Sequence, residues 1–308
     1  MNFKKLPTKV QLFEVGPRDG LQNELTSLTL GKKTAYIEAL IASGLQNIEV
    51  GAFVREDKIP QMANTDELFK ILFQKGYLNK KNLTLWALVP NEKGLDRALN
   101  AQCKAIAVFT GATDTFTQKN IGMRIKESLN IFRKIVKKAK KEKLKIRGYV
   151  SVCWGCPYEG RVLASRVYHL TKELLNMGVE QISLGDTIGV ATPKQVFKLL
   201  NPLKKYIKQD QIAVHFHDTR GTALANCVSA LQLGAVTLDA ASGGLGGCNY
   251  APGASGNVAT EDLVYMLSGM KIKTHVDLEK LCLASRIPLE ALDRPPSSKY
   301  LQAWLAKR

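Results

Sequence analysis

Two histidines separated by a single residue are the most chemically informative feature of this sequence. They lie in AVHFHDTRG at residues 213–221, and Asp218 follows them directly. The apolar residues 212–214 predict a short buried strand, on which residues two apart point to the same side, so His215 and His217 would project together. Two imidazoles beside a carboxylate can bind a metal ion or transfer protons. Such pairs are often incidental, but two of the chain's four histidines occur here, which favours a functional pair.

A second cluster, EVGPRDGLQNE at residues 14–24, follows the first predicted strand. Its glycine and proline make the exit from the strand tight, which would present Arg18 and Asp19 at the end of the strand. The guanidinium of Arg18 offers a planar fork of donors to a carboxylate, a thioester oxygen or an enolate. Asp19 offers a hard oxygen ligand to a cation. The alternative interpretation is an ion pair on the surface.

A third cluster, GGLGGCNYAPGASGN at residues 243–257, is rich in glycine. It does not match the G-x-G-x-x-G pattern of a dinucleotide-binding turn between a strand and a helix. Because glycine permits close backbone approach to a ligand and frees a loop to move, we expect a mobile flap. Cys248 lies in this flap and is predicted to be an exposed, reactive thiol, with an inert cysteine as the alternative.

Short β-like runs alternate with helical patterns along the chain, and these elements must position the three clusters. The predicted strands are residues 10–15, 48–52, 83–89, 105–110, 144–151, 182–186, 212–216 and 235–241. The predicted helices are residues 29–43, 66–74, 92–101, 121–141, 159–177, 219–233 and 261–270, together with one that opens at residue 192. Eight such units predict an α/β fold, a closed (β/α)8 TIM barrel, with a doubly wound open sheet as the competitor.

The positions of the unusual residues support the barrel. Functional groups of such barrels lie at the carboxyl ends of the strands and in the loops that follow. Polar, glycine-rich segments follow the first, sixth, seventh and eighth predicted strands, at residues 16–24, 185–189, 215–221 and 243–257. We assign residues 1–275 to a catalytic barrel and residues 276–308 to a C-terminal helical extension that packs on the barrel.

Composition and charge narrow the function classes. The chain has 308 residues, of which 45% are hydrophobic and 23% charged, with a formal net charge of +17, as in a charged globular protein. Nine basic residues and one glutamate occupy residues 133–147, where apolar residues recur at helical spacing. We interpret this run as an amphipathic helix with a solvated basic face. Nucleic-acid binding is the sharper alternative, but no nucleic-acid module accompanies the charge.

Cysteine use and the chain start suggest a compartment. Six cysteines are scattered along the chain, which favours reduced thiols over a disulfide framework. Cys153 and Cys156 match C-x-x-C, and a packed, unreactive pair is favoured over a redox centre. No apolar run approaches the length of a membrane span, and the first residues lack the pattern of a signal or transit peptide. We therefore expect a cytoplasmic protein without a membrane partner.

At these clusters the sequence resembles the 3-hydroxy-3-methylglutaryl-CoA (HMG-CoA) lyase family of metal-dependent Claisen-type enzymes. The resemblance is carried by EVGPRDGLQNE (14–24), RGYVS (147–151), GCPYEG (155–160), ISLGDTIG (182–189), VHFHDTRG (214–221) and GGLGGCNYAPGASGNVATEDLVYML (243–267). It implies cleavage of HMG-CoA to acetyl-CoA and acetoacetate, in leucine degradation or ketone body metabolism. It also implies an acyl-CoA substrate, Mg²⁺ or Mn²⁺ as the cofactor, and a homodimer.

The resemblance also implies roles for individual residues. The implied metal ligands are Asp19, His215, His217 and Asn257. The implied catalytic residues are Arg18, which would stabilise the enolate, Glu49, which would orient Arg18 or the substrate, Asp186 and Cys248, which would take part in acid–base work, and His215. The implied substrate contacts come from Arg18, Gln22, Tyr149, Ser183 and Thr187.

Some positions depart from the family pattern. The family usually carries TSFVSPKW after the glutamate of the second strand, whereas here VGAFVREDK follows Glu49. Arg220 and Pro252 stand where tyrosine and glutamine are common. The altered second loop motivates an alternative, a related Claisen-type lyase or synthase that acts on a different acyl-CoA or 2-oxo acid. The net charge motivates another, an anion- or nucleic-acid-binding protein on an inactive barrel.

Overall fold

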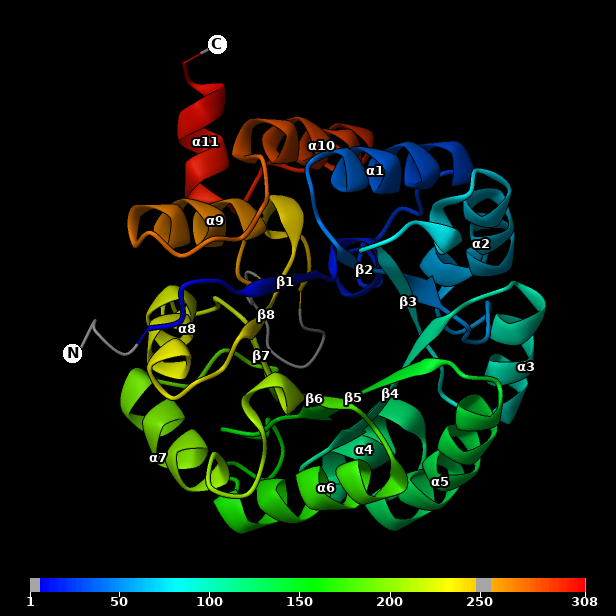
Figure 1. Cartoon of the computed structure of the whole chain (residues 1–308), viewed down its shortest axis with the longest axis vertical. Helices are drawn as coiled ribbons and strands as arrows, with labels where there is room; N and C mark the ends of the chain where they lie inside the picture. The colour runs from blue at the N-terminus through cyan, green and yellow to red at the C-terminus, as the bar shows by residue number, and fades with distance from the viewer. Residues whose placement is uncertain (1–5, 248–255, 308) are drawn as a thin grey trace.

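Eight parallel strands close into a barrel in chain order, and β1 pairs with both β2 and β8. The computed structural model describes residues 6–247 and 256–307. The strands are β1 Gln11–Glu14, β2 Asn47–Ala52, β3 Thr84–Leu88, β4 Ala105–Gly111, β5 Lys145–Ser151, β6 Gln181–Asp186, β7 Ile212–Phe216 and β8 Thr237–Ala240. Helices surround the strands as an outer ring (Figure 1). The predicted (β/α)8 barrel is therefore confirmed, and the open sheet is wrong.

The helices follow the predicted order, with shifts at several boundaries. They are α1 Leu30–Ala42, α2 Thr65–Gln74, α3 Glu92–Asn100, α4 Asp114–Ile121, α5 Ile125–Lys141, α6 Ala164–Met177, α7 Pro193–Leu203, α8 Ala223–Gln232, α9 Thr260–Gly269, α10 Leu278–Ala291 and α11 Lys299–Leu305. The single helix predicted for residues 121–141 is wrong at its start. Gly122 adopts φ 72°, a left-handed conformation that ends α4 and separates it from α5.

Local signals account for the helix ends that the sequence predicted well. The side chain of Thr29 accepts a hydrogen bond from the backbone N–H of Lys32 at the start of α1, and Gly44 follows the helix with φ 97°. Thr192 and Gln195 form a capping box at the start of α7, where Pro193 takes the first helical position. These caps fix the residues at which α1 and α7 begin.

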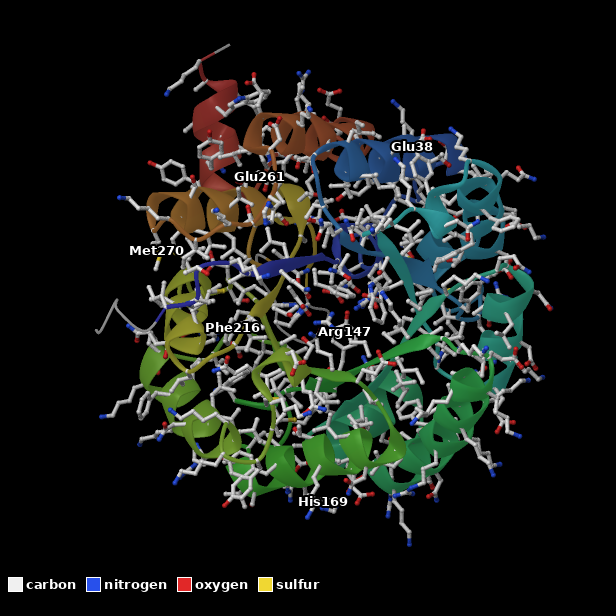
Figure 2. The ribbon with its side chains drawn as sticks, in the orientation of Figure 1. Glu38, Arg147, His169, Phe216, Glu261 and Met270 are labelled. Carbon is white, nitrogen blue, oxygen red and sulfur yellow. The ribbon has the colours of Figure 1, made fainter. Side chains whose placement is uncertain are left out.

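The core has two layers, one between the helices and the barrel and one inside the barrel. The buried face of α5 includes Phe132, Ile135, Val136 and Ala139, while its lysines face outward, so the amphipathic helix is confirmed. Arg147, in contrast, does not belong to that solvated face, although it ends the basic run. It lies on β5, has no exposed surface and occupies the middle of the barrel (Figure 2).

The segment after the barrel packs on one side of it. Helix α10 lies beside α1, and α11 lies beside α9 (Figure 1). The hydroxyl of Ser298, at the start of α11, donates to Asp262 on α9. Among the helices of residues 6–247 and 256–307, none combines the length and the apolar character that a membrane crossing needs.

Candidate active site

A five-residue π-helix, η2 (Gly16–Gly20), follows β1 and presents Arg18 and Asp19 at the carboxyl end of the barrel. The N–H groups of Gly20 and Leu21 donate to the carbonyls of Val15 and Gly16, which keeps the turn tight. Gly16 is required because a Cβ there would collide with the hydroxyl of Tyr36 and the carboxylate of Glu14. The predicted tight exit after the first strand is therefore confirmed, and a π-helix forms it.

Arg18 is held by two carboxylates. Its Nε donates to Glu49 Oε2 at 2.6 Å, and its Nη1 donates to Asp19 Oδ1 at 2.7 Å. Burial would lower the pKa of Arg18, but the charges of Glu49 and Asp19 raise it above its ordinary value. The guanidinium therefore stays charged while it is almost wholly withdrawn from water, which strengthens its interaction with an anionic oxygen.

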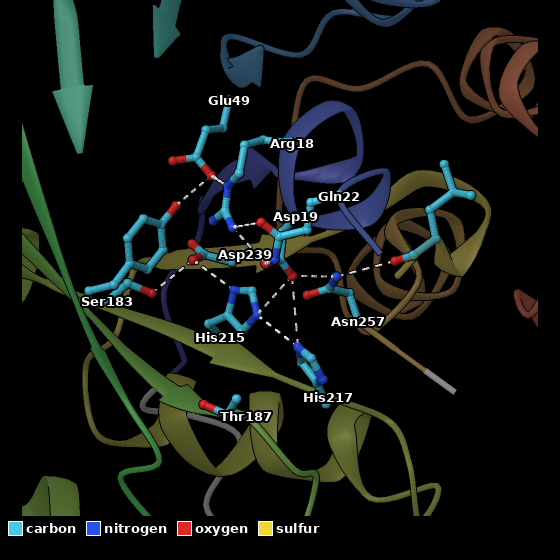
Figure 3. Close-up of polar contacts among 12 residues, drawn as sticks. Arg18, Asp19, Gln22, Glu49, Ser183, Thr187, His215, His217, Asp239 and Asn257 are labelled. Carbon is cyan, nitrogen blue, oxygen red and sulfur yellow. Dashed lines mark hydrogen bonds and ion pairs between the residues drawn. The ribbon is translucent and has the colours of Figure 1, made fainter. Parts of the chain in front are cut away.

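Asp19, His215 and His217 form a group that can hold a divalent metal ion. The two imidazoles come from β7 and the residue after it, and they converge on the Asp19 carboxylate (Figure 3). Nε2 of His215 and Nε2 of His217 lie 3.7 Å and 3.8 Å from Asp19 Oδ2, and 3.2 Å from each other. Nitrogen and carboxylate donors at such spacing suit a divalent cation.

The protonation states of this group fit a cation as well. Burial and the neighbouring His215 lower the pKa of His217 to about 4, so the imidazole of His217 is neutral near pH 7 and keeps a lone pair. Burial would raise the pKa of Asp19, but Arg18 and the two imidazoles lower it below its usual range. A neutral imidazole and an ionised carboxylate are the forms that bind metals.

Asn257, the fourth predicted ligand, lies next to the group. Its Nδ2 donates to Asp19 Oδ2 at 2.9 Å and to the carbonyl oxygen of Leu245 at 3.2 Å (Figure 3). Residues 238 positions apart in the sequence thus meet at one point of the rim. The structure brings all four predicted ligands together.

Glu49 lies at the junction between Arg18 and β5. Its Oε2, which accepts from Arg18, also accepts from the hydroxyl of Tyr149 at 3.1 Å. Burial raises the pKa of Glu49 above its ordinary value, against the opposing effect of Arg18. The predicted orienting contact between Glu49 and Arg18 is therefore present.

The other predicted residues divide into two sets. Gln22 donates from Nε2 to Asp19 Oδ1 at 3.1 Å, and Gln22, Tyr149 and Thr187 all line the cleft described below. Ser183 lies behind His215, where its hydroxyl donates to Asp239 at 2.8 Å. The carboxylate of Asp186 accepts from the backbone N–H groups of Val190 and Ala191 at 3.0 and 2.9 Å. The contacts of Ser183 and Asp186 thus support loop and side-chain positioning, rather than the predicted substrate contact and proton transfer.

Two functional candidates, Arg147 and Asp239, escaped the sequence analysis as individual residues. Arg147 Nη2 forms a buried ion pair with Asp239 Oδ1, and Asp239 Oδ2 lies 3.3 Å from His215 Nδ1. A charged residue within an apolar strand was the available signal, because a barrel strand places alternate residues inside. Asp239 interrupts VTLDAA, and Arg147 interrupts KIRGYV.

The site opens into a cleft of about 740 Å³ at the barrel mouth. Arg18, Asp19, His215 and His217 lie at one part of its lining. The rest includes three cationic side chains, Arg55, Lys58 and Lys119, and three apolar ones, Leu88, Phe109 and Phe116. No residue of α5 lines this cleft among the described residues, so the basic face of α5 is separate from it.

The root of the glycine-rich segment is anchored beside η2. Cys248 and the rest of residues 248–255 lie outside the described residues, so the predicted flap thiol is not placed. Asn23 Nδ2 donates to the carbonyl oxygen of Gly247 at 3.1 Å, and Arg294 Nη2 donates to that of Gly246 at 2.9 Å. The chain before residues 248–255 therefore connects through Asn23 to the loop that carries Asp19, and Asn257 after them contacts Asp19 itself.

Two buried carboxylates accept hydrogen bonds from the backbone at the start of the glycine-rich segment, at Ser242 and Gly243. Glu14 accepts from the N–H groups of Gly16 (2.9 Å) and Ser242 (2.8 Å) and from the hydroxyl of Thr260 (2.7 Å). Burial raises the pKa of Glu14 to about 7, although these hydrogen bonds oppose the rise. Glu261 accepts from the N–H of Gly243 at 2.8 Å, and burial raises its pKa to about 8.

Outside the cleft, the two cysteines of the C-x-x-C pair are packed in the core. Cys153 and Cys156 are both buried and form no disulfide. Burial raises the pKa of the Cys153 thiol above its ordinary value, which suppresses the reactive thiolate. The packed pair predicted from the sequence is confirmed.

A closed (β/α)8 barrel with arginine, carboxylates and imidazoles converging at the carboxyl ends of its strands defines an enzyme of the TIM-barrel class. Residues 9–287 match the sequence profile of the HMGL-like family. The chain belongs to the HMGL-like family.

Individual relatives agree over nearly the whole chain. A hydroxymethylglutaryl-CoA lyase of Bacillus subtilis is 45% identical over 298 residues, which cover 97% of this chain and 98% of the relative. A Pseudomonas aeruginosa enzyme named 3-hydroxy-3-isohexenylglutaryl-CoA/hydroxymethylglutaryl-CoA lyase is 42% identical, with 98% of this chain and 99% of the relative covered. The resemblance predicted from the motifs, and with it the prediction of an enzyme, is confirmed.

Solved structures give the same result. The crystal structure of a Bacillus subtilis HMG-CoA lyase superposes with a TM-score of 0.93 at 45% identity, covering 97% of this chain and 99% of the other. An Acinetobacter baumannii HMG-CoA lyase in complex with coenzyme A and 3-methylmalate superposes with a TM-score of 0.90 at 36% identity, covering 96% and 95%.

Proposed function

We propose that this chain is a carbon–carbon lyase that cleaves HMG-CoA to acetyl-CoA and acetoacetate with a divalent metal ion. The observation that carries the proposal is the convergence of Arg18 with Asp19, His215 and His217 in one cleft. The names of the relatives above support the same substrate.

The reaction makes defined demands on the residues of the cleft. The tertiary hydroxyl at C3 loses its proton, the C2–C3 bond breaks, and the electron pair stays on C2 as the enolate of acetyl-CoA. C3 becomes the ketone of acetoacetate, and C2 then takes up a proton. The chain must therefore stabilise an oxyanion on the thioester, accept one proton and deliver another.

Arg18 is the group we assign to the thioester oxygen. It is buried, permanently charged and oriented by Glu49, so little reorganisation is needed when negative charge develops. Glu49 also accepts a hydrogen bond from the hydroxyl of Tyr149. We assign Gln22, Tyr149 and Thr187, which line the same cleft, to contacts with the acyl group.

Asp19, His215 and His217 would hold the metal, with the neighbouring Asn257 as the fourth ligand. A divalent cation bound there supplies Lewis acidity toward the substrate hydroxyl. We propose Mg²⁺ or Mn²⁺, in keeping with the hard oxygen donors of Asp19 and Asn257. His215 is assigned to the metal, and Cys248 keeps its predicted role in proton transfer, as the donor to the enolate. The contacts of Asp186 support a role in holding the loop after β6.

The cationic rim suits the remainder of an acyl-CoA. Arg55, Lys58 and Lys119 line the mouth of the cleft, and phosphates are anions that arginine and lysine bind readily. We assign the phosphate groups of coenzyme A to this rim. Homodimer formation, a cytoplasmic location and a place in leucine or ketone body metabolism stay predictions from the sequence.

A second candidate function is cleavage of a 3-hydroxyglutaryl-CoA that carries a longer alkyl group at C3. The apolar wall of the cleft, formed by Leu88, Phe109 and Phe116, favours it, as does the altered sequence after Glu49. The Pseudomonas aeruginosa relative is named for both substrates.

One assay tests the proposal and separates the two candidates. Purified protein with Mg²⁺ or Mn²⁺ is given HMG-CoA or 3-hydroxy-3-isohexenylglutaryl-CoA, and acetyl-CoA is measured together with acetoacetate or its alkyl homologue. We expect turnover of HMG-CoA with the higher kcat/KM. A higher kcat/KM for the longer substrate would favour the second candidate, and no product from either would contradict both.

A further inference from the structure

A buried carboxylate contacts one of the metal-site histidines from behind. Asp239 lies on β8 inside the barrel, and its Oδ2 lies 3.3 Å from Nδ1 of His215 (Figure 3). An ionised carboxylate can only accept hydrogen bonds, so Nδ1 of His215 must carry the hydrogen of a neutral ring. Nε2 then holds the lone pair. That atom is the one that faces Asp19 and His217.

Asp239 is itself fixed in place by two further donors. Ser183 Oγ donates to Asp239 Oδ2 at 2.8 Å, and Arg147 Nη2 donates to Asp239 Oδ1. Arg147 has no freedom to move away, because its guanidinium lies 3.7 Å from the centre of the Phe13 ring and its Nη1 donates to Tyr149 at 3.0 Å. The carboxylate therefore keeps both its charge and its orientation without access to water.

These contacts close a ring of polar side chains inside the barrel. From Asp239, hydrogen bonds and ion pairs run through Arg147, Tyr149, Glu49 and Arg18 to Asp19, whose Oδ2 lies 3.7 Å from Nε2 of His215, and His215 contacts Asp239. The ring links the guanidinium assigned to the thioester with the group assigned to the cation. A shift of Asp239 would therefore displace His215 at the metal site. It would also disturb Arg18, through the contacts that begin at Arg147.

We propose that Asp239 is a positioning residue for the metal site, fixing the ring and tautomer of His215 so that its Nε2 is available to the cation. This inference rests on the metal site of the proposed function. Asp239 lies outside every motif that carries the family resemblance, so its role follows from its contacts alone. Partners of this kind hold the rings of metal-binding histidines in many proteins, and their loss weakens metal affinity by roughly 10- to 100-fold.

Asp239→Asn removes the charge that pairs with Arg147 as well as the acceptor for His215, so the tautomer of His215 is the readout that separates the two roles. The amide has nearly the same shape, but it can donate from Nδ2 to Nδ1 of His215, which then moves the ring hydrogen to Nε2 and removes the lone pair from the site. Ser183→Ala is the matched control, because it deletes a bond to the same Oδ2 and leaves the partner of His215 in place.

Two measurements on the metal-free enzyme test the proposal. Calorimetric titration with Mn²⁺ should give a dissociation constant at least 10-fold weaker for Asp239→Asn and within 3-fold of the native value for Ser183→Ala. ¹⁵N NMR of histidine-labelled protein, assigned with His215→Gln, should show the hydrogen on Nδ1 in the native protein and on Nε2 in Asp239→Asn.

An unchanged tautomer of His215 in Asp239→Asn would overturn the proposal, even if the Mn²⁺ constant were weaker. A native spectrum with the hydrogen on Nε2 would also overturn it, and this result does not depend on whether the variant folds. Neither measurement uses HMG-CoA, so failure of the proposed lyase activity would be seen separately, as absent turnover with intact metal binding.

Discussion

Arg18 Nε and Glu49 Oε2 lie 2.6 Å apart in a buried ion pair that joins the loop after β1 to β2. The two side chains come from residues 31 positions apart, and the contact fixes the planar guanidinium in one orientation. A fixed, dry guanidinium stabilises developing negative charge better than a solvated one, because it needs no reorientation during the reaction.

Arg18→Lys should therefore impair catalysis more than binding. Lysine keeps the positive charge but not the planar fork that contacts Glu49 and Asp19 together. We expect kcat to fall by roughly 10²- to 10³-fold with a small change in KM. Steady-state kinetics with HMG-CoA measures both constants. The exposed Arg55→Lys is the control, and similar losses of kcat in the two variants would contradict the assignment.

The metal group predicts a ligand-dependent change in stability. A cation that binds the folded state alone stabilises it by about 2.7 kcal/mol at 100 times its dissociation constant. Adding Mn²⁺ to the metal-free protein should thus raise its melting temperature, and His217→Ala should abolish the rise because one of three converging donors is lost. Thermal unfolding followed by circular dichroism measures the shift. An equal rise in the variant would place the cation elsewhere.

The cationic rim predicts a salt-sensitive effect on substrate affinity. Lys119→Ala removes one positive charge from the mouth of the cleft, so we expect KM for HMG-CoA to rise several-fold with kcat nearly unchanged. The difference from the native enzyme should shrink as NaCl is added, since salt screens exposed charges. Lys137→Ala on the outer face of α5 removes the same charge away from the cleft and should leave KM unchanged.

Burial of Glu14 predicts a pH dependence of stability. Its pKa is raised from 4.5 to about 7 by burial, so between these values the folded state binds more protons than the unfolded one. The free energy of unfolding attributable to Glu14 therefore falls as pH rises through this window and is constant above it. Glu14→Gln resembles the protonated form, so relative to the native enzyme it should gain about 3 kcal/mol between pH 4.5 and 7.

Urea unfolding at several pH values measures this difference. The exposed Glu180→Gln serves as the control and should run parallel to the native enzyme across the window. A Glu14→Gln variant that also runs parallel would show that the buried carboxylate does not take up a proton on folding.

The sequence predicts the barrel well because its signals are local and repeated. Alternation of β-like runs with helices identifies eight units, and caps such as Thr29 and Thr192 identify where helices begin. The helix predicted over residues 121–141 misses the split between α4 and α5, because a glycine within a helical pattern does not by itself reveal the left-handed conformation that ends α4 at Gly122. Helix α4 supplies part of the cleft lining, so the sequence did not predict that part of the site.

The site itself is predictable only in part. The motif after β1 and the motif at the end of β7 identify Arg18, Asp19, His215 and His217, because each group of residues is close together in the sequence. The contact between Asp239 and Arg147 joins residues 92 positions apart, and no local pattern predicts it. The contact of Ser183 with Asp239 likewise joins β6 to β8 within the barrel, and the motif that contains Ser183 does not predict it.

The central claim is that the cleft combines a divalent cation with Arg18 to break the C2–C3 bond of HMG-CoA. Its most direct test is to strip the protein of metal, supply HMG-CoA, and measure acetyl-CoA and acetoacetate before and after Mg²⁺ or Mn²⁺ is added. We predict negligible product without metal and equal amounts of the two products with it. Undiminished cleavage by the metal-free protein, or no cleavage after metal is restored, would contradict the account.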